Sequence, residues 1–215
     1  MVIELGKEHS LLNQFMAEVR DQEIQKDSMR FRRNMERIGE IFAYEISKKL
    51  SWEKKEVTTP LGVAEVPVLK QQPVVATILR AGLPLHQGLL NFFDRAENAF
   101  VSAYRKHHKD GSFDIQLEYV SSPDLNGKAL ILCDPMLATG ASLVLTYKHL
   151  MHRGRPAQTH LVSVIASTEG IAYAKKHLPD NCVLWVGAVD DELTAQAYIV
   201  PGLGDAGDLA YGAKL

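Results

Sequence analysis

From residue 73 onward the chain alternates between short apolar runs and segments with helical periodicity, and this alternation constrains the fold more than any other feature. Residues 73–79 form one continuous apolar run, which is typical of a strand covered on both faces. Similar runs recur at 98–104, 128–133, 159–166 and 182–189, with helix-like segments before or after them. Strands that alternate with helices predict βαβ units, so we expect an α/β fold with a mostly parallel central sheet flanked by helices.

The N-terminal part of the chain has a different pattern. Apolar residues recur every three or four positions over residues 31–50, which predicts an amphipathic helix. Residues 56–69 are β-rich on both sides of a Pro-Leu-Gly turn, which predicts a hairpin. Because no repeat or linker interrupts the sequence, we expect one domain over residues 1–215, with an N-terminal helical and β-hairpin elaboration over 1–70.

Overall composition argues against several classes of partner, although a local basic patch stays open. The chain has 24 Lys and Arg against 26 Asp and Glu, a net charge of −2, so no basic excess favours binding to nucleic acid or to an anionic membrane. No apolar run approaches the length of a membrane span. Cys133 and Cys182 each lie inside an apolar run. We expect them to be buried free thiols in a cytoplasmic protein, with a disulfide as the alternative.

An anion-binding loop is predicted where the run at 128–133 ends. An acidic residue, Asp134, follows this strand, and a short loop containing Thr139, Gly140 and Ser142 then opens a helix. Backbone N–H groups at a helix N-terminus and nearby hydroxyl groups can cradle an anion. A carboxylate can accept hydrogen bonds from sugar hydroxyls, so the combination suits a sugar phosphate. The alternative is an ordinary strand–helix connection with Ser142 as the N-cap.

Two arginines follow apolar strands in a similar way. Arg80 comes directly after the run at 73–79 and precedes Ala-Gly, while Arg105 follows the run at 98–104. An arginine beside a small-residue turn can bind a phosphate through two N–H groups, and two such arginines at neighbouring strand ends could hold one polyanion. The alternative is a pair of solvated arginines at the edge of the sheet.

A third segment, residues 198–208, is rich in turn-forming residues. Three glycines and a proline lie within residues 201–207, and this composition forces a tight, irregular backbone. Such a loop exposes main-chain N–H and C=O groups, which can bind a planar heterocycle with mixed donors and acceptors. Asp205 and Asp208 add charge for hydroxyl groups, a metal or the loop itself. The alternative is a surface turn near the C-terminus.

In their order and spacing, these three segments resemble the uracil phosphoribosyltransferase family. Residues 134–142 are similar to the family's phosphate loop, Asp-Pro-Met-Leu-Ala-Thr-Gly-Gly-Ser, and residues 78–83 to its Ile-Leu-Arg-Ala-Gly-Leu segment. Residues 198–208 are similar to its uracil loop, Tyr-Ile-Ile/Val-Pro-Gly-Leu-Gly-Asp-Ala-Gly-Asp, which is highly specific to this family. The resemblance implies the type I phosphoribosyltransferase fold.

The resemblance also implies a reaction. Uracil and 5-phosphoribosyl 1-diphosphate (PRPP) would give uridine monophosphate (UMP) and diphosphate, a step of pyrimidine salvage. Mg²⁺ would be the cofactor, bound mainly through PRPP and not by direct protein ligands. The family implies homo-oligomers, so we expect a homodimer or homotetramer, with GTP as a candidate effector and neither nucleic acid nor membrane as a partner. A non-catalytic regulator on the same fold that senses UMP and binds RNA is the alternative.

Residue roles follow from the same resemblance. Arg80 and Arg105 would bind the diphosphate, Asp134 would accept the ribose hydroxyls, and Asp205 would contact PRPP; these four are the predicted catalytic residues. The predicted PRPP site consists of Arg80, Arg105, Asp134, Pro135, Met136, Leu137, Ala138, Thr139, Gly140, Ala141, Ser142 and Asp205. The predicted uracil site consists of Ile199, Gly204, Asp205 and Ala206, acting largely through their backbones.

Two expectations concern details of the site. Ala141 replaces the second glycine of the family's phosphate loop. At a positive φ an alanine would cost about 1 kcal/mol, and at a negative φ it would be harmless, which is what we expect. From their position in the sequence, residues 56–69 and 106–112 are expected to cover the site as lids.

Overall fold

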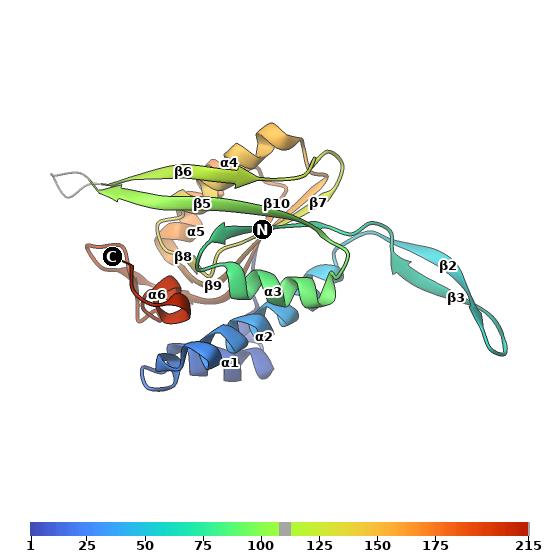
Figure 1. The fold of residues 1–215 in the computed structure, drawn as a ribbon, viewed down its shortest axis with the longest axis horizontal. Helices are drawn as coiled ribbons and strands as arrows, with labels where there is room; N and C mark the ends of the chain where they lie inside the picture. Colours follow the sequence, from blue (N-terminus) through green and yellow to red (C-terminus); the bar gives the residue numbers. More distant parts are fainter. Residues whose placement is uncertain (108–112, 215) are drawn as a thin grey trace.

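A computed structural model describes residues 1–107 and 113–214, without the side chains of 103–117. An eight-stranded sheet lies at its centre, in the order β1-β10-β9-β7-β4-β5-β6, with β8 paired to β9 (Figure 1). Every neighbouring pair in this sheet is parallel except β5 and β6, so the expected mostly parallel sheet is confirmed. Its strands are β1 (Val2–Glu4), β4 (Val74–Leu79), β5 (Glu97–His107), β6 (Phe113–Ser121), β7 (Ala129–Cys133), β8 (Met136–Leu137), β9 (Gln158–Ser167) and β10 (Cys182–Asp190).

Helices cover both faces of the sheet (Figure 1). One hydrophobic core forms between the sheet and the first three α-helices, and a second forms on the opposite face under α4 and α5. The helices are α1 (Leu11–Arg20), α2 (Ser28–Ser47), α3 (Leu83–Phe92), α4 (Ala141–Leu150), α5 (Thr168–His177) and α6 (Ala206–Tyr211). None of the helices described here is long and apolar enough to cross a membrane.

The apolar runs in the sequence are explained by these two cores. Val75 and Ile131 point to the core under α1, α2 and α3, whereas their neighbours Val74 and Leu130 point to the other core. Side chains alternate along a strand, so a strand between two cores needs apolar residues at every position. Cys133, at the end of β7, is buried and free, as is Cys182, which confirms the expectation of unpaired thiols.

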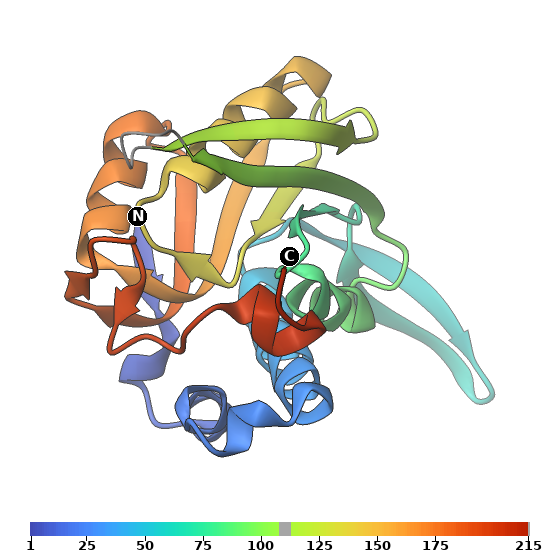
Figure 2. The same ribbon diagram turned by 60° about the vertical axis from the view of Figure 1, so that its left-hand side comes forward.

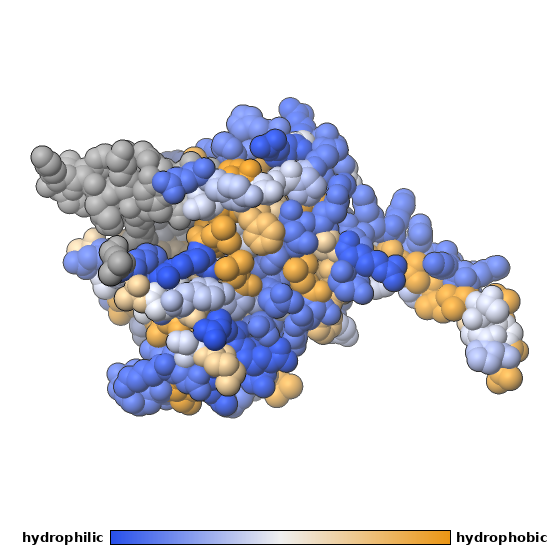
Figure 3. Space-filling model, in the orientation of Figure 1, coloured by the Kyte–Doolittle hydropathy of each residue, from blue (hydrophilic) through white to orange (hydrophobic). Residues whose placement is uncertain are grey.

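The predicted hairpin consists of β2 (Trp52–Thr59) and β3 (Gly62–Leu69), which among the described strands pair only with each other. It extends away from the body of the protein, on the side opposite α6 (Figure 1). Apolar side chains remain uncovered along it (Figure 3), including Leu61 at the turn, which is 100% exposed, and Val63, which is 67% exposed. The expectation that residues 56–69 cover the site of their own chain is therefore wrong. The other expected lid, 106–112, includes residues 108–112, which lie outside the described residues.

Candidate active site

The strands β4, β7, β9 and β10 place the predicted site at their carboxyl ends, where ligands bind in open parallel sheets. The ends of β4 and β7 are adjacent, because Thr77 pairs with Cys133 in register. Gly82 lies at this junction: an added Cβ there would overlap the Thr77 hydroxyl and approach the Cys133 carbonyl oxygen to 3.3 Å. The Arg80 segment and the phosphate loop, defined here as residues 134–142, therefore meet at one edge of the sheet.

The phosphate loop is fixed by backbone bonds before it enters α4. The Asp134 N–H donates to the Val162 carbonyl at 3.0 Å, and one carboxylate oxygen of Asp134 accepts from the Met136 N–H at 3.4 Å. Met136 and Leu137 then pair with β9 as the short strand β8, which the sequence analysis did not predict. The loop thus returns to the sheet before its last residues form the helix N-terminus.

The N-terminus of α4 has the form of an anion cradle. Gly140 is the N-cap, with a φ of 78°, and α4 begins at Ala141. The alternative with Ser142 as the N-cap is therefore wrong, because Ser142 lies inside the helix. Gly140 has no side chain to bind the first-turn N–H groups, and such groups at the positive end of a helix dipole attract anions. Ala141 is not at a positive φ, so this substitution is harmless to the backbone, as expected.

Arg80 is held against the C-terminal helix. One terminal nitrogen of its guanidinium donates to the Asp208 carboxylate at 2.7 Å and to the Gly212 carbonyl oxygen at 2.6 Å. Its Nε is buried and has no hydrogen-bond partner among the described residues. A buried N–H donor without a partner is unfavourable unless a ligand supplies an acceptor. This geometry is suited to an anion at the edge of the sheet.

The uracil loop, defined here as residues 198–208, ends at α6. Asp205 caps this helix, since its carboxylate accepts from the Asp208 N–H at 3.0 Å. Gly207 lies between Asp205 and Arg80: a Cβ added there would be 3.2 Å from the Asp205 carboxylate and 3.6 Å from Arg80 Nε. The structure therefore brings the uracil loop and the Arg80 segment together, and α6 lies beside α2 and α3 (Figure 2).

The remaining predicted uracil-site residues divide by exposure. The side chains of Ile199 and Ala206 are buried, whereas Gly204 is exposed with a φ of 91°. Burial of these side chains leaves their backbone groups as the parts that could contact a base, and their role in binding uracil stays a prediction. Arg105 lies in β5, where it pairs with Ile115, but its side chain is outside the described part of the chain.

Three residues that the sequence analysis did not identify hold these loops. Ser167, at the end of β9, donates to the Ala138 carbonyl at 2.5 Å. Asp190, at the end of β10, accepts from the Gly202 N–H at 2.9 Å and from Arg20 at 2.8 and 2.9 Å. For Asp190 a signal existed, since it is an acidic residue directly after an apolar strand, as Asp134 is. The sequence around Arg20 carried no comparable signal.

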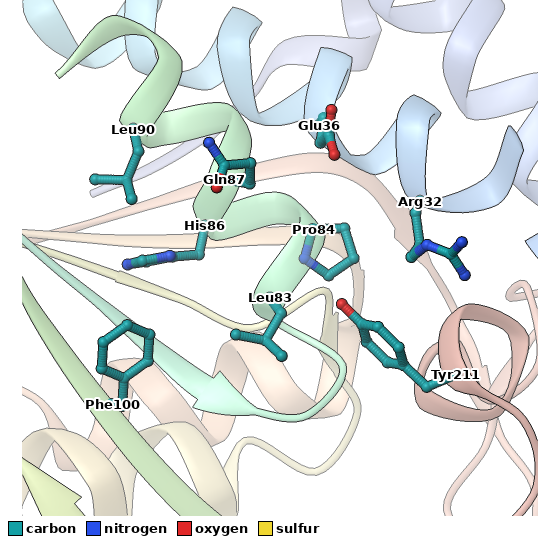
Figure 4. Close-up of a pocket in the computed structure, with 9 residues that line it drawn as sticks. All are labelled: Arg32, Glu36, Leu83, Pro84, His86, Gln87, Leu90, Phe100 and Tyr211. Atoms are coloured by element: carbon teal, nitrogen blue, oxygen red, sulfur yellow. The ribbon is translucent and has the colours of Figure 1, made fainter. Parts of the chain in front are cut away.

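A cavity of about 370 Å³ lies outside this site, between α2, α3, α6 and β5 (Figure 4). None of the predicted PRPP or uracil residues whose side chains the structure describes lines it. Its walls combine apolar and polar side chains: Leu83, Pro84, Leu90, Phe100, Arg32, Glu36, His86, Gln87 and Tyr211. Two elements connect the cavity to the site: Leu83 lines the cavity at the end of the segment that carries Arg80, and Tyr211 lines it from α6, whose Asp208 binds Arg80.

Comparisons with known proteins agree on one family. A family model described as uracil phosphoribosyltransferase matches residues 6–213. The chain belongs to the uracil phosphoribosyltransferase family. A uracil phosphoribosyltransferase of Porphyromonas gingivalis is 57% identical over 214 residues, which cover 100% of this chain and 99% of the relative.

More distant relatives carry the same family name or fold. A uracil phosphoribosyltransferase of Pyrococcus furiosus is 37% identical, with 93% of this chain and 85% of the relative covered. The solved structure of a protein from Aquifex aeolicus is 30% identical and superposes with a TM-score of 0.88 over 100% of both chains. The type I phosphoribosyltransferase fold expected from the sequence is thereby confirmed for this uracil phosphoribosyltransferase family member.

Proposed function

We propose that this chain is an enzyme that transfers the 5-phosphoribosyl group of PRPP to uracil, giving UMP and diphosphate in pyrimidine salvage. One observation carries the proposal: the phosphate loop, Arg80 and the uracil loop meet at one edge of the sheet. Membership of the uracil phosphoribosyltransferase family supports it. The alternative of a non-catalytic RNA-binding regulator receives no support, since the relatives named above carry the name of the enzyme.

The proposed roles follow the sequence predictions. The N-terminus of α4, together with the hydroxyls of Thr139 and Ser142, binds the 5-phosphate, and Asp134 accepts hydrogen bonds from the ribose hydroxyls. Arg80 binds the diphosphate through its unpartnered Nε and through terminal nitrogens released from Asp208. Backbone groups of the uracil loop bind the base, and Asp205 contacts PRPP. Arg105 is proposed as the second diphosphate ligand.

The chemistry then depends on charge stabilisation and on positioning. The bond between the anomeric carbon and the diphosphate oxygen breaks, and the diphosphate leaves with the electron pair. A bond forms between N1 of uracil and the same carbon, and the N1 proton passes to solvent. Negative charge grows on the leaving group, where Arg80 stabilises it. Holding the two substrates in line supplies much of the remaining acceleration, so no covalent nucleophile is needed.

Mg²⁺ is proposed to bind to the site together with PRPP. Mg²⁺ prefers oxygen ligands and is commonly held by one or two carboxylates together with substrate phosphates. Asp134 and Asp205 place carboxylates in the proposed PRPP site, which is compatible with an ion that is held mainly through PRPP and not by direct protein ligands. The described residues contain no group of three or more His, Cys, Asp or Glu that could hold a metal alone. When bound, the ion would neutralise charge on the diphosphate.

Assembly, regulation and location are also proposed. An isolated two-stranded hairpin is marginally stable in water, and the exposed apolar residues of β2 and β3 support a homodimer or homotetramer in which a second copy covers them. The cavity beside α6 supports a nucleotide effector such as GTP, because Tyr211 links the cavity to the helix that holds Arg80. Both hydrophobic cores draw on distant parts of the chain, which supports a single domain, and the free thiols support a cytoplasmic location.

The deciding experiment measures UMP formation from PRPP, Mg²⁺ and uracil, with cytosine, hypoxanthine and orotate as parallel substrates. Turnover with uracil alone is expected. Asp205→Asn should abolish it, and because asparagine is also a good N-cap, α6 should remain folded. Asp94→Asn, an exposed position after α3, is the matched control and should keep full activity. Binding of PRPP without turnover of any base, with and without GTP, would contradict the proposal.

A further inference from the structure

Two buried polar side chains stand next to each other at the ends of β9 and β10. Ser167 is the last residue of β9, Asp190 is the last residue of β10, and the two are partners in the register of the sheet. Ser167 is 0% exposed and Asp190 is 7% exposed. Each of them binds the backbone of a different loop: Ser167 contacts the phosphate loop and Asp190 contacts the uracil loop.

Asp190 and Arg20 together bind the backbone N–H and C=O groups of one residue of the uracil loop, Gly202. Asp190 accepts from the Gly202 N–H at 2.9 Å, and Arg20 donates to the Gly202 carbonyl oxygen at 3.0 Å. The two side chains bind each other through both carboxylate oxygens, at 2.8 and 2.9 Å. Burial acts to raise the pKa of Asp190, but the hydrogen bonds from Arg20 and the Gly202 N–H outweigh it and lower that pKa. The Asp190 carboxylate is thus ionised in the folded protein, and its hydrogen bonds to Arg20 and Gly202 fix its position.

The position of Gly202 makes its contacts with Asp190 and Arg20 relevant to base binding. Gly202 lies between Ile199 and Gly204, two of the residues predicted to bind uracil through their backbones. It has a φ of 57°, and a Cβ at this position would overlap the Ile199 carbonyl. The turn is therefore tight, so a shift of Gly202 moves the groups on both sides of it. Arg20 comes from α1, which means that the N-terminal elaboration reaches into the site.

Ser167 holds the phosphate loop in a comparable way. Its hydroxyl donates to the Ala138 carbonyl at 2.5 Å and accepts from the Gly170 N–H at 2.8 Å. Gly170 allows α5 to lie directly on the loop, since an added Cβ would overlap the carbonyls of Leu137 and Ala138. Residues 137 and 138 of the phosphate loop therefore pack against the start of α5, and the buried Ser167 hydroxyl binds the second of them.

We propose that these are separate positioning residues for the two substrates: Asp190 with Arg20 fixes the uracil loop, and Ser167 fixes the phosphate loop. The inference rests on the proposed function, because it takes those loops as the uracil and PRPP sites. Their adjacency on β9 and β10 sets the distance between the two loops. Ser167 and Asp190, held at the ends of neighbouring strands, would keep the two substrates in line for displacement at the anomeric carbon.

Steady-state kinetics with each substrate varied in turn tests this division of roles. Arg20→Lys keeps the charge but cannot bridge both carboxylate oxygens and the Gly202 carbonyl. We expect it to raise KM for uracil about tenfold and to change KM for PRPP by less than about twofold. Asp190→Asn should act in the same direction. Ser167→Ala should show the reverse, with KM for PRPP raised and KM for uracil nearly unchanged.

Ser10→Ala is the matched control for loss of a helix cap, because Ser10 caps α1 and touches neither loop. It should leave both KM values unchanged. The inference is overturned if each variant raises both KM values together with a loss of thermal stability, or if neither KM moves. Arg20 is 24% exposed, so Arg20→Lys keeps the test valid if Asp190→Asn fails to fold. A wild-type enzyme that turns over no base would overturn the proposed function too, whereas wild-type turnover without the crossed KM pattern would overturn this inference alone.

Discussion

Exchanging glycine and alanine at two adjacent positions of the phosphate loop should have very different effects. Gly140 has a φ of 78° and is the N-cap of α4, whereas Ala141 is the first residue of that helix and has no positive φ. We predict that Gly140→Ala impairs both folding and PRPP binding. Ala141→Gly, which would create the double glycine of the family's loop, should be nearly neutral.

The magnitude for Gly140→Ala follows from two features of the structure. A left-handed conformation costs an alanine about 1–2 kcal/mol, and the less flexible unfolded chain offsets about 0.4–1 kcal/mol of this. The new Cβ would also lie 2.8 Å from the Gly170 carbonyl oxygen, about 0.6 Å inside ordinary contact distance. A displacement of about 1 Å at a reacting group can cost about a hundredfold in rate, so half of that corresponds to roughly tenfold in kcat/KM for PRPP.

Urea unfolding and PRPP kinetics measure the two effects. Gly140→Ala should lower the free energy of unfolding by about 1 kcal/mol and kcat/KM for PRPP by about tenfold. Ala141→Gly should lower the free energy of unfolding by less than about 1 kcal/mol, with kcat/KM within about twofold of wild type. Equal losses of kcat/KM for PRPP in the two variants, or a larger loss in Ala141→Gly, would refute the argument from the φ of Gly140.

Three further predictions address other parts of the chain. Burial lowers the pKa of His160 from 6.5 to about 4, so the unfolded chain takes up the proton first and stability falls as the pH decreases below about 6.5. When the pH is lowered from about 7.5 to 5, the free energy of unfolding measured in urea should fall by about 2 kcal/mol more for wild type than for His160→Asn. Asparagine retains a hydrogen-bond acceptor for Trp185. Equal losses in the two proteins would contradict this prediction. Arg80→Lys should raise KM for PRPP about tenfold, while a lysine at the exposed Arg95 should not. Leu61→Ser should shift sedimentation velocity toward the monomer, and an unchanged distribution would show that the hairpin tip is not an interface.

Sequence periodicity predicted most of the elements that bury a face, but α1 and the short strand β8 were not predicted. The strands β4, β7, β9 and β10 were foreseen because they lie between two cores and therefore need continuous apolar runs. The hairpin begins at Trp52, four residues before the predicted start, because β2 is exposed along its whole length and needs no alternation. The three residues of β1 are too few to show a period, and they are a strand only because they pair with β10.

The same division applies to the candidate site. Groups expected to touch substrate sit in glycine-rich turns after apolar strands, and such turns have a local signature at Arg80, Asp134 and Asp205. Among the three residues that hold those turns, Asp190 alone has a comparable signal, because it is an acidic residue at the end of an apolar strand. Arg20 binds Asp190 across 170 positions of sequence, so no local pattern could pair them. Asp190 is at the end of a strand, yet its role depends on a loop that returns to it 12 residues later.

It follows that intact motifs are not sufficient for an intact site in this fold. The proposed contacts to phosphate and base are largely backbone groups, and a backbone group is only as well placed as the turn that carries it. Those turns are fixed by side chains from β9, β10 and α1, none of which belongs to a motif. A chain could therefore keep every residue of the phosphate and uracil loops and still bind its substrates poorly after a single change at Arg20 or Ser167. Family membership identifies the chemistry, whereas the efficiency of that chemistry depends on the residues that support the loops from the scaffold.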